Sequence, residues 1–150
     1  MDTIRFYRPS EDYGEFSNFS PHRIHLDGKS WPTSEHYFQA QKFHDPAYRE
    51  RIRTARSPMD AANLGRDRKQ KLRPDWESVK VEVMRNAVRA KFSQHAELTA
   101  LLLATGDAKL VEHTANDAYW GDGGDGRGRN MLGQVLMQVR EALRAAAASE

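Results

Sequence analysis

The pattern of apolar residues changes at Pro32, and this change constrains the fold more than any other feature of the sequence. Before Pro32, Ile4 and Phe6 alternate with polar neighbours, and Asp27-Gly28 interrupts another alternating segment. Asp-Gly is typical of a tight hairpin because both turn positions need a positive φ. After Pro32 the pattern becomes helical. The sequence therefore predicts a small N-terminal β hairpin or sheet followed by a mostly helical chain.

Capping residues and helix breakers predict where the helices begin and end. Ser57 is a suitable cap, Pro58 suits the first helical position, and Gly65 ends that helix. Similar signals predict helices over residues 33–43, 45–56, 74–92, 96–105 and 131–143, with a short strand at Leu110 and Val111. The alanine-rich tail is expected to fray. Without repeats or a linker, residues 1–150 are expected to form a single α+β domain.

Composition limits the protein class. The chain has 150 residues, 39% of them hydrophobic, with a net charge of +2 and no cysteine. Disulfides and thiolate metal sites are therefore excluded, and the charge is too small to indicate nucleic-acid binding by itself. There is no signal-like apolar segment and no 18-residue apolar run. We expect a cytoplasmic protein with no membrane partner.

A glycine-rich segment, NDAYWGDGGDGRGRN, covers residues 116–130. Arg127-Gly128 stands where a P-loop needs Lys-Ser/Thr, and Asp122 and Asp125 are spaced wrongly for an EF-hand. Glycines expose backbone N–H groups, aspartates such as Asp117 accept hydrogen bonds, and Trp120 offers a flat apolar surface. Asn130 could cap the following helix. The segment is either a polar surface turn or a ligand-binding loop.

Glu35, Gln39 and Lys42 are spaced four and three residues apart, so a helix would place them on one stripe. Such a stripe is either an ordinary solvated face or a functional one. In the functional interpretation, the carboxylate transfers protons, while the amine acts as a nucleophile or an electrostatic partner.

Basic residues cluster before Trp76: Arg66, Arg68, Lys69, Lys71 and Arg73. Cations beside an aromatic ring suit a phosphorylated ligand with a planar ring, and arginine favours bidentate phosphate contacts. The cluster could also hold a nucleic-acid backbone or be solvated. The spacing of His36, His44, His95 and His113 does not suit a metal site, so no metal is expected.

Taken together and in this order, these segments resemble the NADAR superfamily, and in particular its YbiA-type N-glycosidases. The resemblance is carried by FYRPSEDYGEFSNFSP, WPTSEHYFQAQKF, the long segment from SPMDAANLG to AKF, and LLLATGDAKLVEHTANDAYWGDGGDGRGRNMLG. It covers a core of about residues 4–144. The resemblance implies a helix-rich α+β domain of the YbiA type. The implied activity is hydrolysis of the bond between ribose and an exocyclic amine in phosphoribosylamino-pyrimidine intermediates of riboflavin biosynthesis.

The resemblance also implies site residues. Glu35 matches the key acidic position, and Trp76, Asp117, Trp120 and the Ser17-Asn18-Phe19 segment match other functional positions. We add Lys42 as a catalytic candidate, and Gly65, Arg66, Arg73 and Asn130 as substrate-binding candidates. Glu35 and Asp117 would share proton transfer and water activation, while Trp76 and Trp120 would stack on the pyrimidine.

The expected partner is a small phosphorylated riboside, and no cofactor is expected. One alternative is removal of ADP-ribose from guanine in DNA, which other members of the superfamily are associated with. A second alternative is a non-catalytic nucleotide-binding module.

Overall fold

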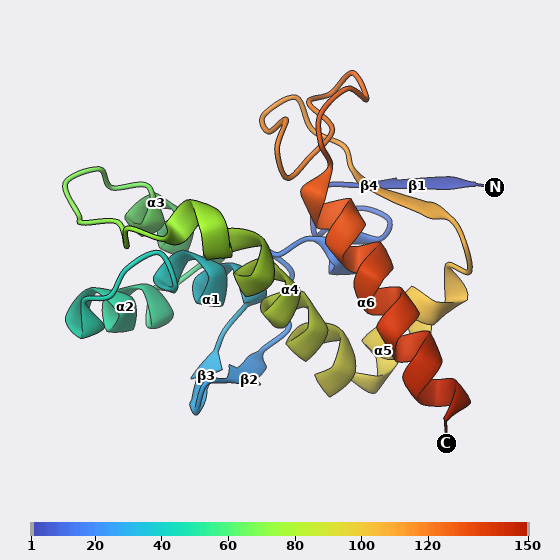
Figure 1. The fold of residues 1–150 in the computed structure, drawn as a ribbon, viewed down its shortest axis with the longest axis horizontal. Coiled ribbons are helices and arrows are strands. Elements are labelled where there is room, and N and C mark those ends of the chain that lie inside the picture. Colours follow the sequence, from blue (N-terminus) through green and yellow to red (C-terminus); the bar gives the residue numbers. More distant parts are fainter. Residues whose placement is uncertain (1, 150) are drawn as a thin grey trace. The chain divides into compact units, whose positions relative to one another are not determined.

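A computed structural model describes residues 2–149. Two compact units make up the chain: residues 18–91 form one, and residues 2–17 together with 92–149 form the other. We call them the central unit and the terminal unit. The expectation of a single domain stays a prediction. Within residues 2–149, six α-helices and four short strands confirm a mostly helical α+β fold (Figure 1).

The central unit begins with the predicted hairpin. Strands β2 (Ile24–Leu26) and β3 (Lys29–Trp31) pair antiparallel, and the turn residues Asp27 and Gly28 have φ values of 55° and 75°. These are the positive values that the Asp-Gly pair predicts. The Trp31 indole donates a hydrogen bond to the Leu26 carbonyl at 3.0 Å, which joins the two strands through a side chain as well.

Three short helices follow, each with a side chain that caps its N-terminus, and the cap at Ser57 is as predicted. Thr33 caps α1 (Ser34–Ala40), Asp45 caps α2 (Pro46–Arg53), and Ser57 caps α3 (Pro58–Gly65). In each case the side-chain oxygen accepts a backbone N–H that the first helical turn leaves without a partner. The helix predicted over residues 33–43 ends earlier, at Ala40, so Lys42 lies in the turn that follows it.

Helix α1 packs against α2 and α3 (Figure 1). These helices and the hairpin share an apolar core. Its buried members include Ile24, Trp31, Tyr37, Phe43 and Ile52. A long helix, α4 (Trp76–Gln94), adds Ala87 and Ala90 to this core.

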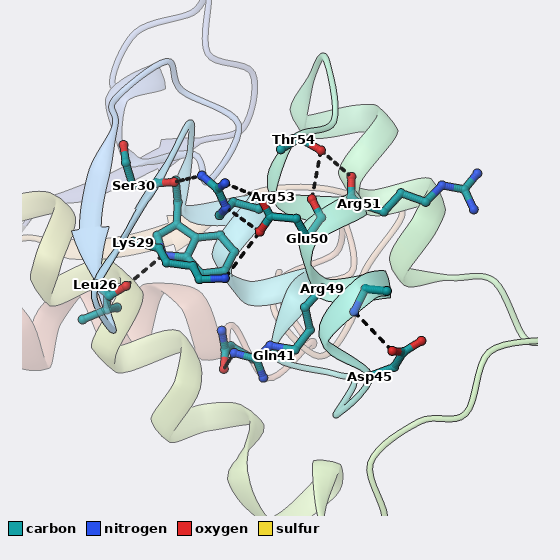
Figure 2. A network of polar contacts seen from close by, with 12 residues as sticks. Leu26, Lys29, Ser30, Gln41, Asp45, Arg49, Glu50, Arg51, Arg53 and Thr54 are labelled. Atoms are coloured by element: carbon teal, nitrogen blue, oxygen red, sulfur yellow. Dashed lines mark hydrogen bonds and ion pairs between the residues drawn. The ribbon is translucent and has the colours of Figure 1, made fainter.

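Polar contacts join the hairpin to α2. Figure 2 shows Arg53 extending from α2 toward Ser30, whose carbonyl accepts a hydrogen bond from the guanidinium at 3.0 Å. Glu50 pairs with Arg53 and lies 3.4 Å from the Lys29 ammonium. The hydrogen bond from Arg53 lowers the pKa of Glu50 to about 2, against the opposing effect of desolvation. This network holds the hairpin against the C-terminal half of α2.

In the terminal unit, β1 (Thr3–Phe6) pairs in parallel with β4 (Lys109–Glu112). The sequence predicted both strands but not that they pair. Helix α5 (Ala96–Ala104) precedes β4 and is followed by Gly106, with φ of 62°. A single 3₁₀ turn at Gly14–Phe16 places Phe16 against Phe6 and Phe92.

Helix α6 (Met131–Ala148) packs against β4 and α5. The prediction that the alanine-rich tail frays is wrong, because the helix continues through Ala145–Ala148. Alanine has the highest intrinsic helix propensity, and these residues extend a helix already nucleated by the packed turns before them. None of the helices within residues 2–149 has the length and apolar character that crossing a membrane requires.

Candidate functional site

The predicted stripe of Glu35 and Gln39 is buried in the central unit. Their side chains are only 8% and 5% exposed, so this part of the stripe is not a solvated face. The Gln39 amide nitrogen donates to a Glu35 carboxylate oxygen at 2.7 Å, across one turn of α1. A carboxylate is seldom buried without a partner, and this bond holds it in one orientation.

Asn18 positions the start of the helix that carries Glu35. Its carbonyl accepts the Glu35 backbone N–H at 3.2 Å, and its side-chain oxygen accepts from the Ser34 hydroxyl at 2.8 Å. Its amide nitrogen contacts the Met84 sulfur at 3.3 Å. These contacts position the start of α1 and with it Glu35, and the substrate-binding role proposed for Asn18 stays a prediction.

Lys42 follows the end of α1 and is half-buried. Its ammonium lies 3.5 Å from the Gly65 carbonyl and 5.8 Å from the centre of the Phe38 ring. Burial lowers the pKa of Lys42, the Glu35 charge raises it, and the charges of Arg66 and Lys80 lower it further. The net result is a pKa below the ordinary value of 10.5, which increases the fraction of free amine at a given pH.

Gly65 makes room for Gln39. A Cβ at position 65 would lie 1.9 Å from the Gln39 side-chain oxygen, so only glycine allows α3 to approach α1 this closely. The hydrogen bond from the Gln39 nitrogen to Glu35 orients that oxygen toward Gly65. The oxygen is buried and has no hydrogen-bond partner within residues 2–149. In the structure Gly65 therefore supports the orientation of Glu35, whereas its predicted contact with substrate stays a prediction.

Gly65→Ala is expected to destabilise the protein by about 1–3 kcal/mol, the usual cost of overpacking a core. The new methyl would displace Gln39, so Gln39→Ala in the same chain should cancel part of the loss. Urea unfolding of the two single variants and the double variant measures this coupling. Asn63→Ala, on an exposed part of the same helix, is the control and should change stability by less than about 0.5 kcal/mol. Equal effects of the two α3 variants would contradict the steric explanation.

Trp76 is 5% exposed and begins α4. Its ring meets Phe38 edge to face, with the ring centres 5.2 Å apart. Phe38 thus connects Trp76 to Lys42, although the sequence indicated only that Phe38 is part of the core. Lys80, whose charge lowers the pKa of Lys42, was not among the candidates from the sequence. Its position one turn after Trp76 was the signal that could have identified it. The stacking role proposed for Trp76 stays a prediction.

The two candidate phosphate ligands differ in their surroundings. Arg73 donates two hydrogen bonds to Asp75, at 2.7 and 3.0 Å, and lies 3.4 Å from the Gln41 carbonyl. The hydrogen bond to Asp75 raises the pKa of Arg73, despite some desolvation. Arg66 is exposed and directly follows the last residue of α3. Its charge is close enough to Lys42 to lower the pKa of that lysine. Arg66 is therefore the better candidate for a substrate phosphate.

In the terminal unit, Asp117 organises the start of the glycine-rich loop. One carboxylate oxygen accepts the backbone N–H groups of Tyr119 at 2.9 Å and Trp120 at 2.8 Å. The Trp120 and Tyr119 rings meet edge to face at 5.0 Å. Asp117 and Trp120 are both partly exposed, as a ligand-binding role requires. Of the remaining candidates, Ser17 is buried and Phe19 is partly buried.

Asp122 holds the middle of the loop and is 3% exposed. Its carboxylate accepts hydrogen bonds from His113 at 2.7 Å, Thr114 N–H at 3.0 Å and Gly124 N–H at 2.9 Å. Desolvation raises the pKa of Asp122, but these hydrogen bonds outweigh it and lower the pKa overall. A carboxylate engaged in this way shapes the loop.

Asn130 precedes α6 in the left-handed conformation, with φ of 53°, and its side chain does not cap the helix. The capping prediction is wrong because both amide groups are used elsewhere. The oxygen accepts Glu112 N–H at 3.0 Å, and the nitrogen donates to the Leu110 carbonyl at 2.9 Å. Asn130 thus bonds the backbone of β4, and the substrate-binding role proposed for it stays a prediction.

The central unit thus brings together Glu35, Lys42, Gly65 and Arg66, with Trp76 linked to them through Phe38. The terminal unit places Asp117 and Trp120 at one end of the glycine-rich loop. Within residues 2–149, no group of three or more His, Asp or Glu side chains has a metal-binding arrangement.

Comparison with known proteins identifies the family. Residues 5–144 match the NADAR domain. The N-glycosidase YbiA of Escherichia coli (strain K12) is 68% identical over 144 residues, covering 95% of this chain and 90% of the relative. The riboflavin biosynthesis protein VVA0006 of Vibrio vulnificus is 51% identical over 140 residues, covering 93% of this chain but only 38% of that longer protein.

A solved structure supports the same family assignment. The NMR structure of Escherichia coli YbiA matches with a TM-score of 0.93 and 64% identity, covering 99% of this chain and 89% of that one. The chain belongs to the NADAR domain family and is similar to its N-glycosidase YbiA over nearly its whole length.

Proposed function

We propose that this protein hydrolyses the N-glycosidic bond between ribose and an exocyclic amine in phosphoribosylamino-pyrimidine intermediates of riboflavin biosynthesis. Two relatives, the N-glycosidase YbiA and the riboflavin biosynthesis protein VVA0006, support the reaction and the pathway by their names. The observation that carries the proposal is the buried Glu35 carboxylate, held by Gln39, with the Lys42 amine close enough for the Glu35 charge to raise the pKa of Lys42.

Glu35 and Lys42 suit a glycosylamine, a sugar whose C1 is bonded to an amine nitrogen. When the C1–O bond of the ribose ring opens and the ring oxygen takes a proton, C1 and the base nitrogen form an imine. The free amine of Lys42 can add to C1, and the base leaves as an amine after its nitrogen is protonated. Water then hydrolyses the imine between C1 and Lys42, which releases the sugar and restores the lysine.

Glu35 would move the protons in this sequence. The ring oxygen and the leaving nitrogen each need a proton, and water must lose one, so the carboxyl group alternates between acid and base. If Lys42 is instead only an electrostatic partner, Glu35 assists direct attack of water on C1. Both routes need Glu35, but only the first makes a covalent bond to Lys42.

Asp117 stays our second candidate carboxylate, because glycosidic cleavage commonly uses two carboxylates in different roles. Its carboxylate also holds Tyr119 and Trp120, so Asp117→Ala would disturb the loop. Asp117→Asn keeps an acceptor oxygen for those N–H groups and removes only the charge. It is therefore the sharper variant for testing the chemistry.

The substrate is tested by offering the purified protein a phosphoribosylamino-pyrimidine and, separately, DNA carrying ADP-ribose on guanine. We expect kcat/KM to be higher for the pyrimidine. A higher value for the modified DNA would replace this proposal with the second candidate substrate, whose bond also joins ribose C1 to an exocyclic amine. Binding of the pyrimidine without turnover would support a non-catalytic module instead.

Arg66→Ala is expected to raise KM for the phosphorylated pyrimidine at least about tenfold, the loss of about 1.4 kcal/mol of binding from one charged contact. KM for the dephosphorylated form should change little. Arg73→Ala is the matched comparison, and we expect a smaller difference between the two substrates because Asp75 already holds that guanidinium. Equal KM changes for both forms of the substrate in Arg66→Ala would exclude a phosphate contact.

A further inference from the structure

The terminal unit contains a cavity of about 540 Å³. Its walls are one face of the β1–β4 sheet, the first turns of α6, and the glycine-rich loop from Asp122 to Asn130. Glu35, Lys42 and Trp76 do not line it, and neither do Asp117 and Trp120. The cavity is therefore separate from the residues that we assign to catalysis.

The strand register explains why the sheet wall is basic. Thr3 pairs with Lys109 and Arg5 with Val111, so their side chains share one face. His113, two residues beyond Val111, continues the same alternation and also lines the cavity. On the opposite face the alternation places Phe6 and Leu110, which are buried. One side of this small sheet thus forms the core, and the other carries cations toward the cavity.

The cations around the cavity lack acidic partners. Within residues 2–149, the side chains of Arg5 and Lys109 make no hydrogen bond or ion pair, and Arg129 makes only a contact with the Tyr119 ring, at 5.1 Å. Asp122 already accepts hydrogen bonds from His113 and the backbone. Asp125 is the remaining carboxylate in the lining. The walls therefore carry an excess of positive charge.

The loop adds backbone donors. Gly124 and Gly126 line the cavity with φ values of 86° and 81°, a conformation that turns successive N–H groups outward. The Gly124 N–H is used by Asp122. The N–H groups of Asp125 and Gly126 have no acceptor within the described chain, residues 2–149, so they remain available to a ligand.

We propose that this cavity binds a phosphate-bearing anion, held by Arg5, Lys109 and Arg129 and by the free N–H groups of the loop. Its volume is within the range of about 300–1,000 Å³ that is usual for small-ligand sites. No Phe, Tyr or Trp lines it, so the ligand is recognised by its phosphate rather than by a stacked base. Asn130, a substrate-binding candidate for the proposed function, also lines the cavity, but the anion binding proposed here rests on Arg5, Lys109 and Arg129 and does not depend on that function.

Pyrophosphate is the first probe. In ¹⁵N-labelled full-length protein, pyrophosphate should shift the amide signals of Gly124, Gly126 and Gly128, and the titration should give a dissociation constant. Arg5→Ala combined with Lys109→Ala should weaken binding at least about tenfold, since two charged contacts are lost. Both side chains are exposed, so the folded state should persist.

The matched control combines Arg8→Ala with Arg127→Ala. Both residues are exposed in the same unit, outside the lining, and this variant loses the same net charge. We expect it to bind pyrophosphate within about twofold of the wild type, because screened charges outside the site contribute little. Equal weakening in the two double variants would overturn the proposal, since binding would then depend only on net charge. Absence of glycine shifts in the wild type would also overturn it.

A second titration distinguishes two sources of the phosphate. A short single-stranded oligothymidylate that competes with pyrophosphate would identify the phosphodiester backbone as the source. Failure to compete, with pyrophosphate binding intact, would identify a small phosphorylated molecule. Turnover of the pyrimidine substrate by Arg5→Ala/Lys109→Ala is measured in parallel and should be unchanged. If the wild type does not turn over the pyrimidine substrate at all, the proposed function is refuted, and the result for pyrophosphate binding still stands.

Discussion

Glu35→Gln is expected to reduce kcat/KM about 10²- to 10⁴-fold, the usual contribution of a general acid or base. The substitution preserves shape, and the new amide oxygen can still accept the hydrogen bond from Gln39. Stability should therefore change by no more than about 1 kcal/mol. Steady-state kinetics with the phosphoribosylamino-pyrimidine and urea unfolding of the same preparation measure the two effects separately.

Glu97→Gln is the matched control, because it makes the same chemical change at an exposed position in the first turn of α5. It should leave kcat/KM within about twofold of the wild type, as surface substitutions usually do. A nearly normal kcat in Glu35→Gln would remove this carboxylate from the chemistry. In that case the buried hydrogen bond between Glu35 and Gln39 would contribute only to the stability of the fold.

Lys42→Arg is expected to reduce turnover more than about 10³-fold if the lysine amine attacks C1. Arginine keeps the positive charge but has no nucleophilic amine at neutral pH, so the variant separates covalent from electrostatic roles. Borohydride added during turnover should attach the sugar to Lys42 of the wild type, as detected by peptide mass spectrometry. Trapping should increase with pH, with a midpoint below the ordinary lysine pKa of 10.5, because burial lowers the pKa of Lys42.

Lys69→Arg provides the control for this experiment, since Lys69 is exposed and its side chain has no described partner. The Lys69→Arg variant should turn over the substrate as fast as the wild type, and borohydride should attach the sugar to its Lys42 to the same extent. If Lys42→Arg retains most of the activity, the electrostatic role is correct. Active cleavage by the wild type without an adduct at Lys42 would lead to the same conclusion.

Local features of the fold were predictable because each depends on a few neighbouring residues. Thr33, Asp45 and Ser57 cap helices within two or three residues of themselves. Asp27-Gly28 forms its turn in the same way. The family resemblance added the activity and marked Glu35, which no cap or turn could have indicated.

Other features depend on residues far apart in the chain. The pairing of β1 with β4 joins residues more than a hundred positions apart, and neither strand carries a signal that names its partner. The capping role expected of Asn130 was wrong for the same reason. Its amide groups bond the backbone of β4, so they are not available to cap α6 as the local sequence suggested.

The sequence by itself determined where the helices and turns lie, and it placed Glu35 and Gln39 on one helical stripe, since both follow from spacing along the chain. Only the tertiary structure decided that this stripe is buried. That outcome depends on α3, where Gly65 lacks a side chain and leaves space for the Gln39 amide. A helical repeat defines a face, but the burial and electrostatics of that face depend on the element that packs against it.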